Sequence, residues 1–151
     1  MTGYLLNTNI VSELRKPPAR RPVLINTWAQ ELSEQQAYLS VITIVEIERG
    51  LLLLERKDAA QAQPLRRWFE RDILEGYAER ILPLSLKAAR RAAALQVLNP
   101  RPLVDTFIAA TALEHNLTLV TRNVKDFHDT GVRVTNPWEP HITTVTLDIP
   151  R

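Results

Sequence analysis

DTFIAATALEHNLTLVTRNVKDF, residues 105–127, is the stretch of sequence that decides the fold. A helical apolar pattern that begins at Val104 runs to His115, and the β-prone run Leu117–Thr121 follows at once. A helix that leads straight into a short buried strand is typical of α/β proteins with parallel sheets. Ligands bind at the carboxyl ends of strands in such sheets. Polar residues that follow the strands are therefore candidate functional residues.

The same alternation of strands and helices extends in both directions from this stretch. Further strands are expected at residues 4–6, 37–42, 81–84 and 132–135, and further helices at residues 23–34, 43–57, 58–77 and 85–98. A first helix follows residues 4–6 with Thr8 or Asn9 as its N-cap, and Pro64 predicts a break within 58–77. This order predicts an α/β fold with a mostly parallel central sheet and helices on both faces.

The chain has 151 residues, a length that is most simply one domain. We assign residues 1–138 to that domain and residues 139–151 to a C-terminal tail. The tail contains the β-prone run Thr143–Leu147. An edge strand, a contact with a partner and an ordered arm are the alternatives for this run.

Composition excludes several kinds of site. The chain has no cysteine, which excludes disulfides, zinc-thiolate sites and cysteine nucleophiles. The N-terminus lacks the basic and apolar regions of a signal peptide, and no apolar run approaches the about 20 residues that cross a membrane. We therefore expect a cytoplasmic protein without a membrane segment. The net charge of +2 permits contact with nucleic acid without requiring it.

Residues with oxygen ligands follow the predicted strands. Converging carboxylates repel one another unless a cation neutralises them, and oxygen ligands without His or Cys favour Mg²⁺ or Mn²⁺ over zinc. The pattern therefore predicts metal and phosphate chemistry. The candidate residues are Asn7, Thr8, Thr43, Glu46, Asp105, Thr121, Asn123 and Asp126.

Several of these residues also have a purely structural interpretation. Thr43 and Glu46 have the spacing of a capping box at a helix start, and an acid at position 105 complements the dipole of a helix that begins there. Asn7 fits an N-cap, and Asp126 fits a surface turn. Spacing alone leaves both interpretations open.

Basic, aromatic and histidine side chains give weaker signals. Four cations are candidate RNA contacts, although a solvated basic loop also explains them: Arg15, Lys16, Arg20 and Arg21. Three aromatic residues are expected in the core: Trp28, Trp68 and Phe69. Three histidines lack the spacing of a catalytic pair or metal site and are expected at the surface: His115, His128 and His141.

Four motifs, taken together in order and spacing, resemble a known family. They are LLNTNIVSEL at 5–14, SVITIVEIERG at 40–50, the stretch quoted above, and NPW at 136–138. Together they resemble the PIN-domain toxins of bacterial toxin–antitoxin pairs, of the VapC type, and within these the FitB-like group. The resemblance runs from about Tyr4 to Trp138.

The resemblance implies a PIN-like fold and an endoribonuclease that depends on Mg²⁺ or Mn²⁺ and hydrolyses RNA phosphodiesters. By motif, Glu46 and Asp105 correspond to acids of the family's site. A further acid belongs either at position 123, where this chain has Asn123, or at Asp126. The supporting polar residues that the resemblance implies are Thr8, Thr43 and Thr121.

Asn7 departs from the family, which has an acid at this position. An amide oxygen can coordinate a cation, but it brings no charge. We therefore expect weakened metal binding and turnover, whether Asn7 is natural or engineered. The alternative is a non-catalytic PIN-fold module that only binds antitoxin or RNA.

The resemblance also implies partners. These are a cognate VapB-like antitoxin, an RNA substrate and a second copy of the chain in a homodimer, with a higher assembly when antitoxin is bound. Apolar residues in the helical segments 44–54 and 65–74 exceed what one small sheet needs to cover. Apolar helical faces left over after the core commonly mark interfaces.

Overall fold

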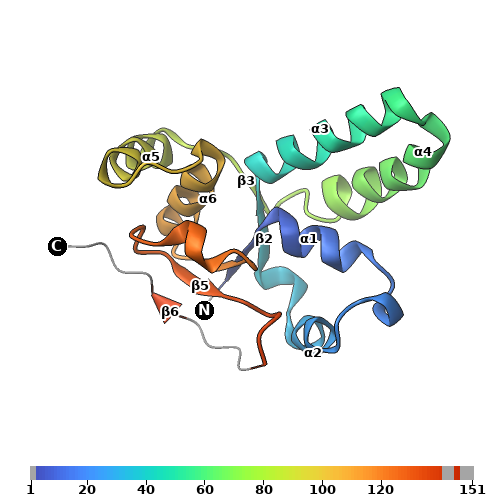
Figure 1. The fold of residues 1–151 in the computed structure, drawn as a ribbon, viewed down its shortest axis with the longest axis horizontal. Coiled ribbons are helices and arrows are strands. Elements are labelled where there is room, and N and C mark those ends of the chain that lie inside the picture. The colour runs from blue at the N-terminus through green and yellow to red at the C-terminus, as the bar shows by residue number, and fades with distance from the viewer. Residues whose placement is uncertain (1–2, 141–144, 147–151) are drawn as a thin grey trace.

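The structure is a computed structural model, and it describes residues 3–140 and 145–146. Its central sheet has the strand order β3-β2-β1-β4-β5-β6 (Figure 1). The strands are β1 (Tyr4–Leu6), β2 (Ala37–Ser40), β3 (Ile81–Leu82), β4 (Thr118–Val120), β5 (Arg133–Thr135) and β6 (Val145–Thr146). Strands β1 to β5 are parallel to their neighbours, and β6 is antiparallel to β5.

Helices cover both faces of this sheet, which confirms the predicted fold class. The helices are α1 (Thr8–Arg15), α2 (Val23–Glu31), α3 (Val41–Lys57), α4 (Ala59–Trp68), α5 (Leu86–Leu98) and α6 (Leu103–Glu114). A π-helical segment, Phe69–Glu75, continues from α4. In Figure 1 the hairpin of α3 and α4 and the helices α1 and α2 lie to one side of the sheet, and α5 and α6 lie to the other.

Alternation along the strands creates the two cores. Leu6 of β1 and Val120 of β4 pack with α1, α2 and the α3–α4 hairpin. Leu5 and Leu119, one residue earlier in each strand, pack with α5 and α6 on the opposite face. Successive side chains of a strand point to opposite faces, so two adjacent leucines of β1 serve both layers.

The carboxyl ends of β1 and β4 lie side by side. Their register pairs Leu6 with Val120, and the backbone N–H of Asn7 donates to the carbonyl of Val120 at 3.0 Å. The next residues along each strand, Asn7 and Thr121, therefore meet at one edge of the sheet.

Helix boundaries differ from the sequence-based expectation at several points. Asn7 is the N-cap of α1, because its side-chain oxygen reaches the first free N–H. This confirms the N-cap interpretation of Asn7, whereas Thr8 and Asn9 lie inside the helix. Ser40 caps α3 in the same way, so this helix begins at Val41 and not at Thr43. Helix α4 continues through Pro64.

The break in the α3–α4 segment lies at Asp58. The backbone of Asp58 is extended, and its side chain accepts from the N–H of Gln61 as the cap of α4. A polar cap therefore starts a new helix here, at the expected boundary between segments 43–57 and 58–77, whereas the further break predicted at Pro64 does not occur.

Three other elements are shorter than expected. Helix α2 ends at Glu31, and β2 and β3 end at Ser40 and Leu82. In the tail, Val145–Thr146 forms the antiparallel edge strand β6. The rest of the predicted run Thr143–Leu147, and His141, lie outside the described residues. The division of the chain at residue 138 stays a prediction. No helix in the described part of the chain is long and apolar enough to span a membrane.

Candidate active site

Asn7 is held by two hydrogen bonds at the end of β1. Its Oδ1 accepts from the backbone N–H of Thr8 at 2.9 Å, and its Nδ2 donates to Thr121 Oγ1 at 3.0 Å. The side chain is buried. The cap requires an acceptor on one side, which forces the amide nitrogen towards Thr121.

Glu46 is anchored by a threonine of another helix. Thr8 Oγ1 donates to Glu46 Oε1 at 2.6 Å and lies 3.4 Å from Thr43 Oγ1, which is fully buried. The capping-box interpretation of Thr43 and Glu46 is therefore wrong: Ser40 is the cap of α3, and the Glu46 carboxylate bonds to α1. Helix α3 therefore presents the Glu46 side chain to the first residue of α1, beside the end of β1.

Thr121 is the centre of a crowded polar cluster. Its Oγ1 accepts from Asn7 Nδ2 at 3.0 Å, from Asn9 Nδ2 at 3.1 Å and from the N–H of Asn123 at 3.2 Å. A hydroxyl offers two acceptor positions and one donor, so three donors exceed its capacity. In addition, Asn9 Oδ1 is buried without a hydrogen-bond partner.

Asp105 lies in the first turn of α6 and feels two other carboxylates. Burial is the main cause that raises the pKa of Asp105 from 3.8 to about 6, followed by the negative charges of Asp126 and Glu46. The nearby Arg101 acts in the opposite direction. Three acids from three elements therefore share one electrostatic environment, beside Asn7 and Thr121.

The chemistry of these side chains suits a divalent cation, but their positions do not form a complete metal site. All the donors are oxygens, and the pKa of Asp105 is raised by burial first and then by the negative charges of Asp126 and Glu46. Among the residues that the structure describes, however, no three acidic, His or Cys side chains are close enough to form a metal-binding group. The amide at position 7 supplies no charge, whereas the sequence resemblance implies an acid there.

Sequence reasoning overlooked Arg101. Its guanidinium donates to the carbonyls of Asn99 and His128 at 3.1 and 2.5 Å. These bonds join the loop before Asp105 to the turn that carries Asp126. A cation four residues before an acid at a helix start was the available signal, but its partner lies 27 residues away in sequence.

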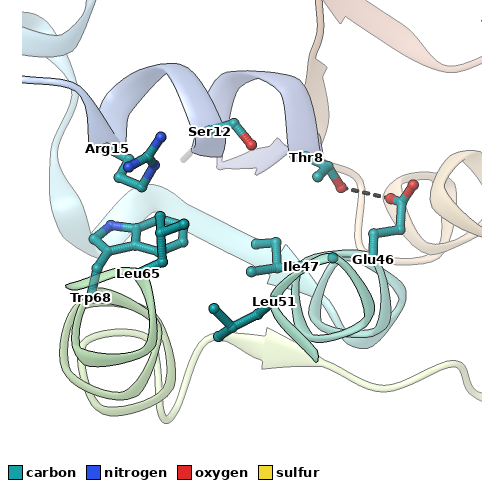
Figure 2. Close-up of a pocket in the computed structure, with 9 residues that line it drawn as sticks. Thr8, Ser12, Arg15, Glu46, Ile47, Leu51, Leu65 and Trp68 are labelled. Atoms are coloured by element: carbon teal, nitrogen blue, oxygen red, sulfur yellow. Dashed lines mark hydrogen bonds between the residues drawn. The ribbon is translucent and has the colours of Figure 1, made fainter. Parts of the chain in front are cut away.

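A groove leads away from Glu46 between α1, α3 and α4 (Figure 2). It has a volume of about 270 Å³ and is lined by Thr8, Ser12, Arg15, Glu46, Ile47, Gly50, Leu51, Leu65 and Trp68. Trp28 and Phe69 are buried as predicted. Trp68 is half-buried: it packs against the core cluster, as predicted, and also lines this groove.

The four candidate RNA contacts divide into two kinds. Arg15, Lys16 and Arg20 are exposed and line a second cavity that adjoins the groove at Arg15. Arg21 instead donates to the carbonyls of Leu14 and Lys16 at 2.6 and 2.7 Å. Its guanidinium closes the loop after α1. His115 and His128 are exposed, as predicted.

Comparison with known proteins agrees with this architecture. The model of the PIN domain family matches residues 4–132, which include both strand ends and all the acids described above. The chain belongs to the PIN-domain family. This confirms the family that the four sequence motifs indicated.

Relatives within the family are similar over nearly the whole chain. The VapC ribonuclease Y4jK of Sinorhizobium fredii is 34% identical, covering 90% of this chain and 98% of the relative. The toxin FitB of Neisseria gonorrhoeae is 36% identical, covering 89% and 97%. The crystal structure of FitAcB from Neisseria gonorrhoeae superposes with a TM-score of 0.79 at 33% identity, covering 90% of this chain and 99% of that one.

Proposed function

We propose that this chain is the toxin of a toxin–antitoxin pair and cleaves RNA phosphodiesters with a divalent cation, Mg²⁺ or Mn²⁺. The observation that carries this function is the shared environment of Glu46, Asp105 and Asp126 at the carboxyl edge of a PIN-domain sheet. The similarity to proteins named as a VapC ribonuclease and a toxin supports the same class of activity.

The site residues have distinct roles in this proposal. Asp105, Glu46 and Asp126 would hold the cation, with Asn7 as a neutral fourth ligand. A bound divalent cation would polarise the scissile phosphate and neutralise the charge that develops in the transition state. Thr8 orients the Glu46 carboxylate through its 2.6 Å hydrogen bond. Thr43 contacts the Thr8 hydroxyl, and the backbone N–H of Asn123 donates to the Thr121 hydroxyl, so these residues hold the two threonines in place.

Asn7 attenuates the activity in this proposal. Thr121 Oγ1 is contacted by three N–H donors, one of them from Asn7. A carboxylate at position 7 would keep the acceptor for Thr8 and offer a second acceptor to the Thr121 hydroxyl. The surroundings of Asn7 therefore suit an acid better than an amide, which supports a natural or engineered loss of charge.

A metal titration with purified protein tests the function. Labelled RNA is incubated with the chain, with Asn7→Asp and with Asp105→Asn over a range of Mg²⁺ and Mn²⁺ concentrations. We expect strong cleavage by Asn7→Asp, weak cleavage by the unchanged chain and none by Asp105→Asn. Absence of cleavage by folded Asn7→Asp at every metal concentration would contradict the nuclease function.

A second candidate function is a non-catalytic module that binds antitoxin or RNA. The observation that favours it is that both polar atoms of the Asn7 side chain are used within the fold, by Thr8 and Thr121. Binding without cleavage by both the unchanged chain and Asn7→Asp would select this candidate.

We also propose an antitoxin partner, a homodimer and a cytoplasmic location. The antitoxin proposal rests on relatives that are described in complexes, such as FitAB bound to a DNA fragment. The dimer proposal rests on exposed apolar side chains of α3, among them Val45, Leu52 and Leu53. The other apolar residues of the α3–α4 hairpin mostly pack against the core, so the surplus is smaller than the sequence indicated.

A further inference from the structure

The chemical character of the groove beside Glu46 changes along its length. Figure 2 shows Thr8 and Glu46 at one end and Arg15 and Trp68 at the other. Ile47, Leu51 and Leu65 provide apolar surface between them. One wall thus begins at the acids of the proposed active site and ends at an aromatic ring and a cation.

Arg15 joins this groove to exposed positive charge. It also lines the cavity formed with Lys16, Pro17 and Arg20. Its guanidinium carbon lies 6.0 Å from the centroid of the Trp68 ring, which is the outer limit of a cation–π contact. The ring therefore holds the exposed guanidinium only weakly, and it remains free to contact an anion.

Acidic residues make the other cavity beside Arg15 unfavourable for a polyanion. A neighbouring cavity that shares Arg15 and Trp68 also contains Glu34 and Asp72. A polyanion that leaves the groove at Arg15 is repelled by these carboxylates and attracted by Arg20, and less strongly by Lys16, whose ammonium is paired with Glu13 at 2.8 Å. The distribution of charge therefore defines one path for a chain of phosphates.

Gly50 keeps the groove open. It lies inside α3, where glycine lowers helix stability. A Cβ at this position would meet no atom within 4 Å, so packing within the described chain does not require glycine. Gly50 lines the groove, and a side chain there would narrow it.

We propose that this groove binds one base of single-stranded RNA beside the cleaved phosphodiester, with Trp68 contacting the base and Arg15 contacting a neighbouring phosphate. The inference rests on the proposed ribonuclease function. The volume of about 270 Å³ lies just below the about 300–1,000 Å³ of small-molecule sites, which suits a single base. An apolar peptide segment would not account for Arg15 at the groove's end or for the exposed cations of the adjoining cavity, Lys16 and Arg20.

Binding measurements without cleavage test this inference. The probe is a fluorescein-labelled single-stranded RNA about ten nucleotides long, titrated with protein in EDTA and followed by anisotropy. We expect Trp68→Leu to weaken binding about 5- to 100-fold, the usual effect of losing one base–aromatic contact. Trp68→Phe should retain most of the affinity. Arg15→Met should weaken binding and reduce its salt dependence, whereas Arg91→Met on exposed α5 should change neither.

Gly50 provides a test that does not depend on weakened folding. Gly50→Leu should raise or preserve the melting temperature, because leucine favours a helix and the Cβ at this position meets no atom within 4 Å. The same variant should weaken RNA binding, whereas Gly50→Ala should weaken it less. A stable Gly50→Leu with unchanged RNA affinity would overturn the inference.

The outcomes separate this inference from the proposed function. RNA binding that depends on Trp68 and Gly50 supports the subsite even if no variant cleaves RNA. Cleavage by Asn7→Asp with RNA affinity unaffected by Trp68→Leu overturns the subsite alone. Loss of antitoxin binding in Trp68→Leu with unchanged RNA affinity would assign the groove to a protein segment and also overturn it.

Discussion

A single amide, Asn7, sets the charge of the candidate site. Its oxygen caps α1 and its nitrogen faces Thr121, and the carboxylate that the family pattern has here differs from it mainly in charge. We expect Asn7→Asp to raise the rate of metal-dependent RNA cleavage by about 10²–10³, the usual effect of one preorganised electrostatic group. Initial rates with Mn²⁺ and metal affinity by calorimetry measure the effect.

A charge control accompanies this substitution. Asn116→Asp adds the same charge at an exposed position in the turn before β4, away from the carboxyl edge. It should leave the cleavage rate unchanged. Equal rates for Asn7→Asp and the unchanged chain would mean that position 7 does not contribute through charge.

Asp105 links the site to pH. Its pKa of about 6 exceeds the ordinary 3.8 because of burial and the charges of Asp126 and Glu46. Between these values the folded state binds more protons than the unfolded state, so metal-free stability falls as pH rises through about 6. We expect the melting temperature in EDTA to decrease from pH 4 to pH 7.

Removing the carboxylate should remove this dependence. Asp105→Asn should melt at a higher temperature than the unchanged chain at pH 7.5 in EDTA, although it should not cleave RNA. Asp72→Asn, on the exposed π-helical segment, should retain the pH dependence. A lower melting temperature for Asp105→Asn would show that the carboxylate stabilises the fold.

At the scale of elements, Arg101 fixes two acid-bearing segments to each other. Its guanidinium donates to the carbonyl of Asn99, in the loop before Asp105, and to the carbonyl of His128, directly after the turn that carries Asp126. We expect Arg101→Met, placed in the Asn7→Asp protein, to lower cleavage about 10- to 100-fold, as loss of a supporting partner at a metal site does. The pKa of Asp105 should also rise further, because the attraction of Arg101 is lost.

Arg133→Met is the matched control for Arg101. Arg133 also donates to a loop carbonyl, that of Asn116 at 2.7 Å, but it begins β5 at the amino edge of the sheet. Cleavage should be unaffected. If both variants lose activity equally, the effect is one of general stability.

At the scale of the whole molecule, exposed apolar residues of α3 predict self-association. Val45, Leu52 and Leu53 line a cavity of about 590 Å³ together with Arg49 and Arg56. We expect the chain to be a dimer at micromolar concentration and Leu52→Glu to be a monomer, by light scattering, because removing a charge from water in an apolar interface opposes association.

Val23→Glu is the comparison for this variant. Val23 is 78% exposed at the start of α2, so a charge there should leave the dimer intact. A dimer that persists in folded Leu52→Glu would place the interface elsewhere on the molecule.

The sequence by itself determined the family and the order of elements, and it supplied the candidate acids of the proposed site. These follow from local properties: alternation of apolar runs, the residues that follow each strand, and four motifs in order. The two-sided core also follows, because adjacent residues such as Leu5 and Leu6 must face opposite layers.

Only the tertiary structure decided which polar residue serves which role. Thr43 and Glu46 have capping-box spacing, yet the hydroxyl of Thr8, 38 residues away, binds the carboxylate. Likewise Arg101 and His128 meet across 27 residues, and Trp68 reaches the groove because α4 folds back on α3. The spacing of residues in the sequence indicates which side chains are neighbours within one helix. These contacts instead depend on how separate elements pack, and no single segment of sequence contains that information.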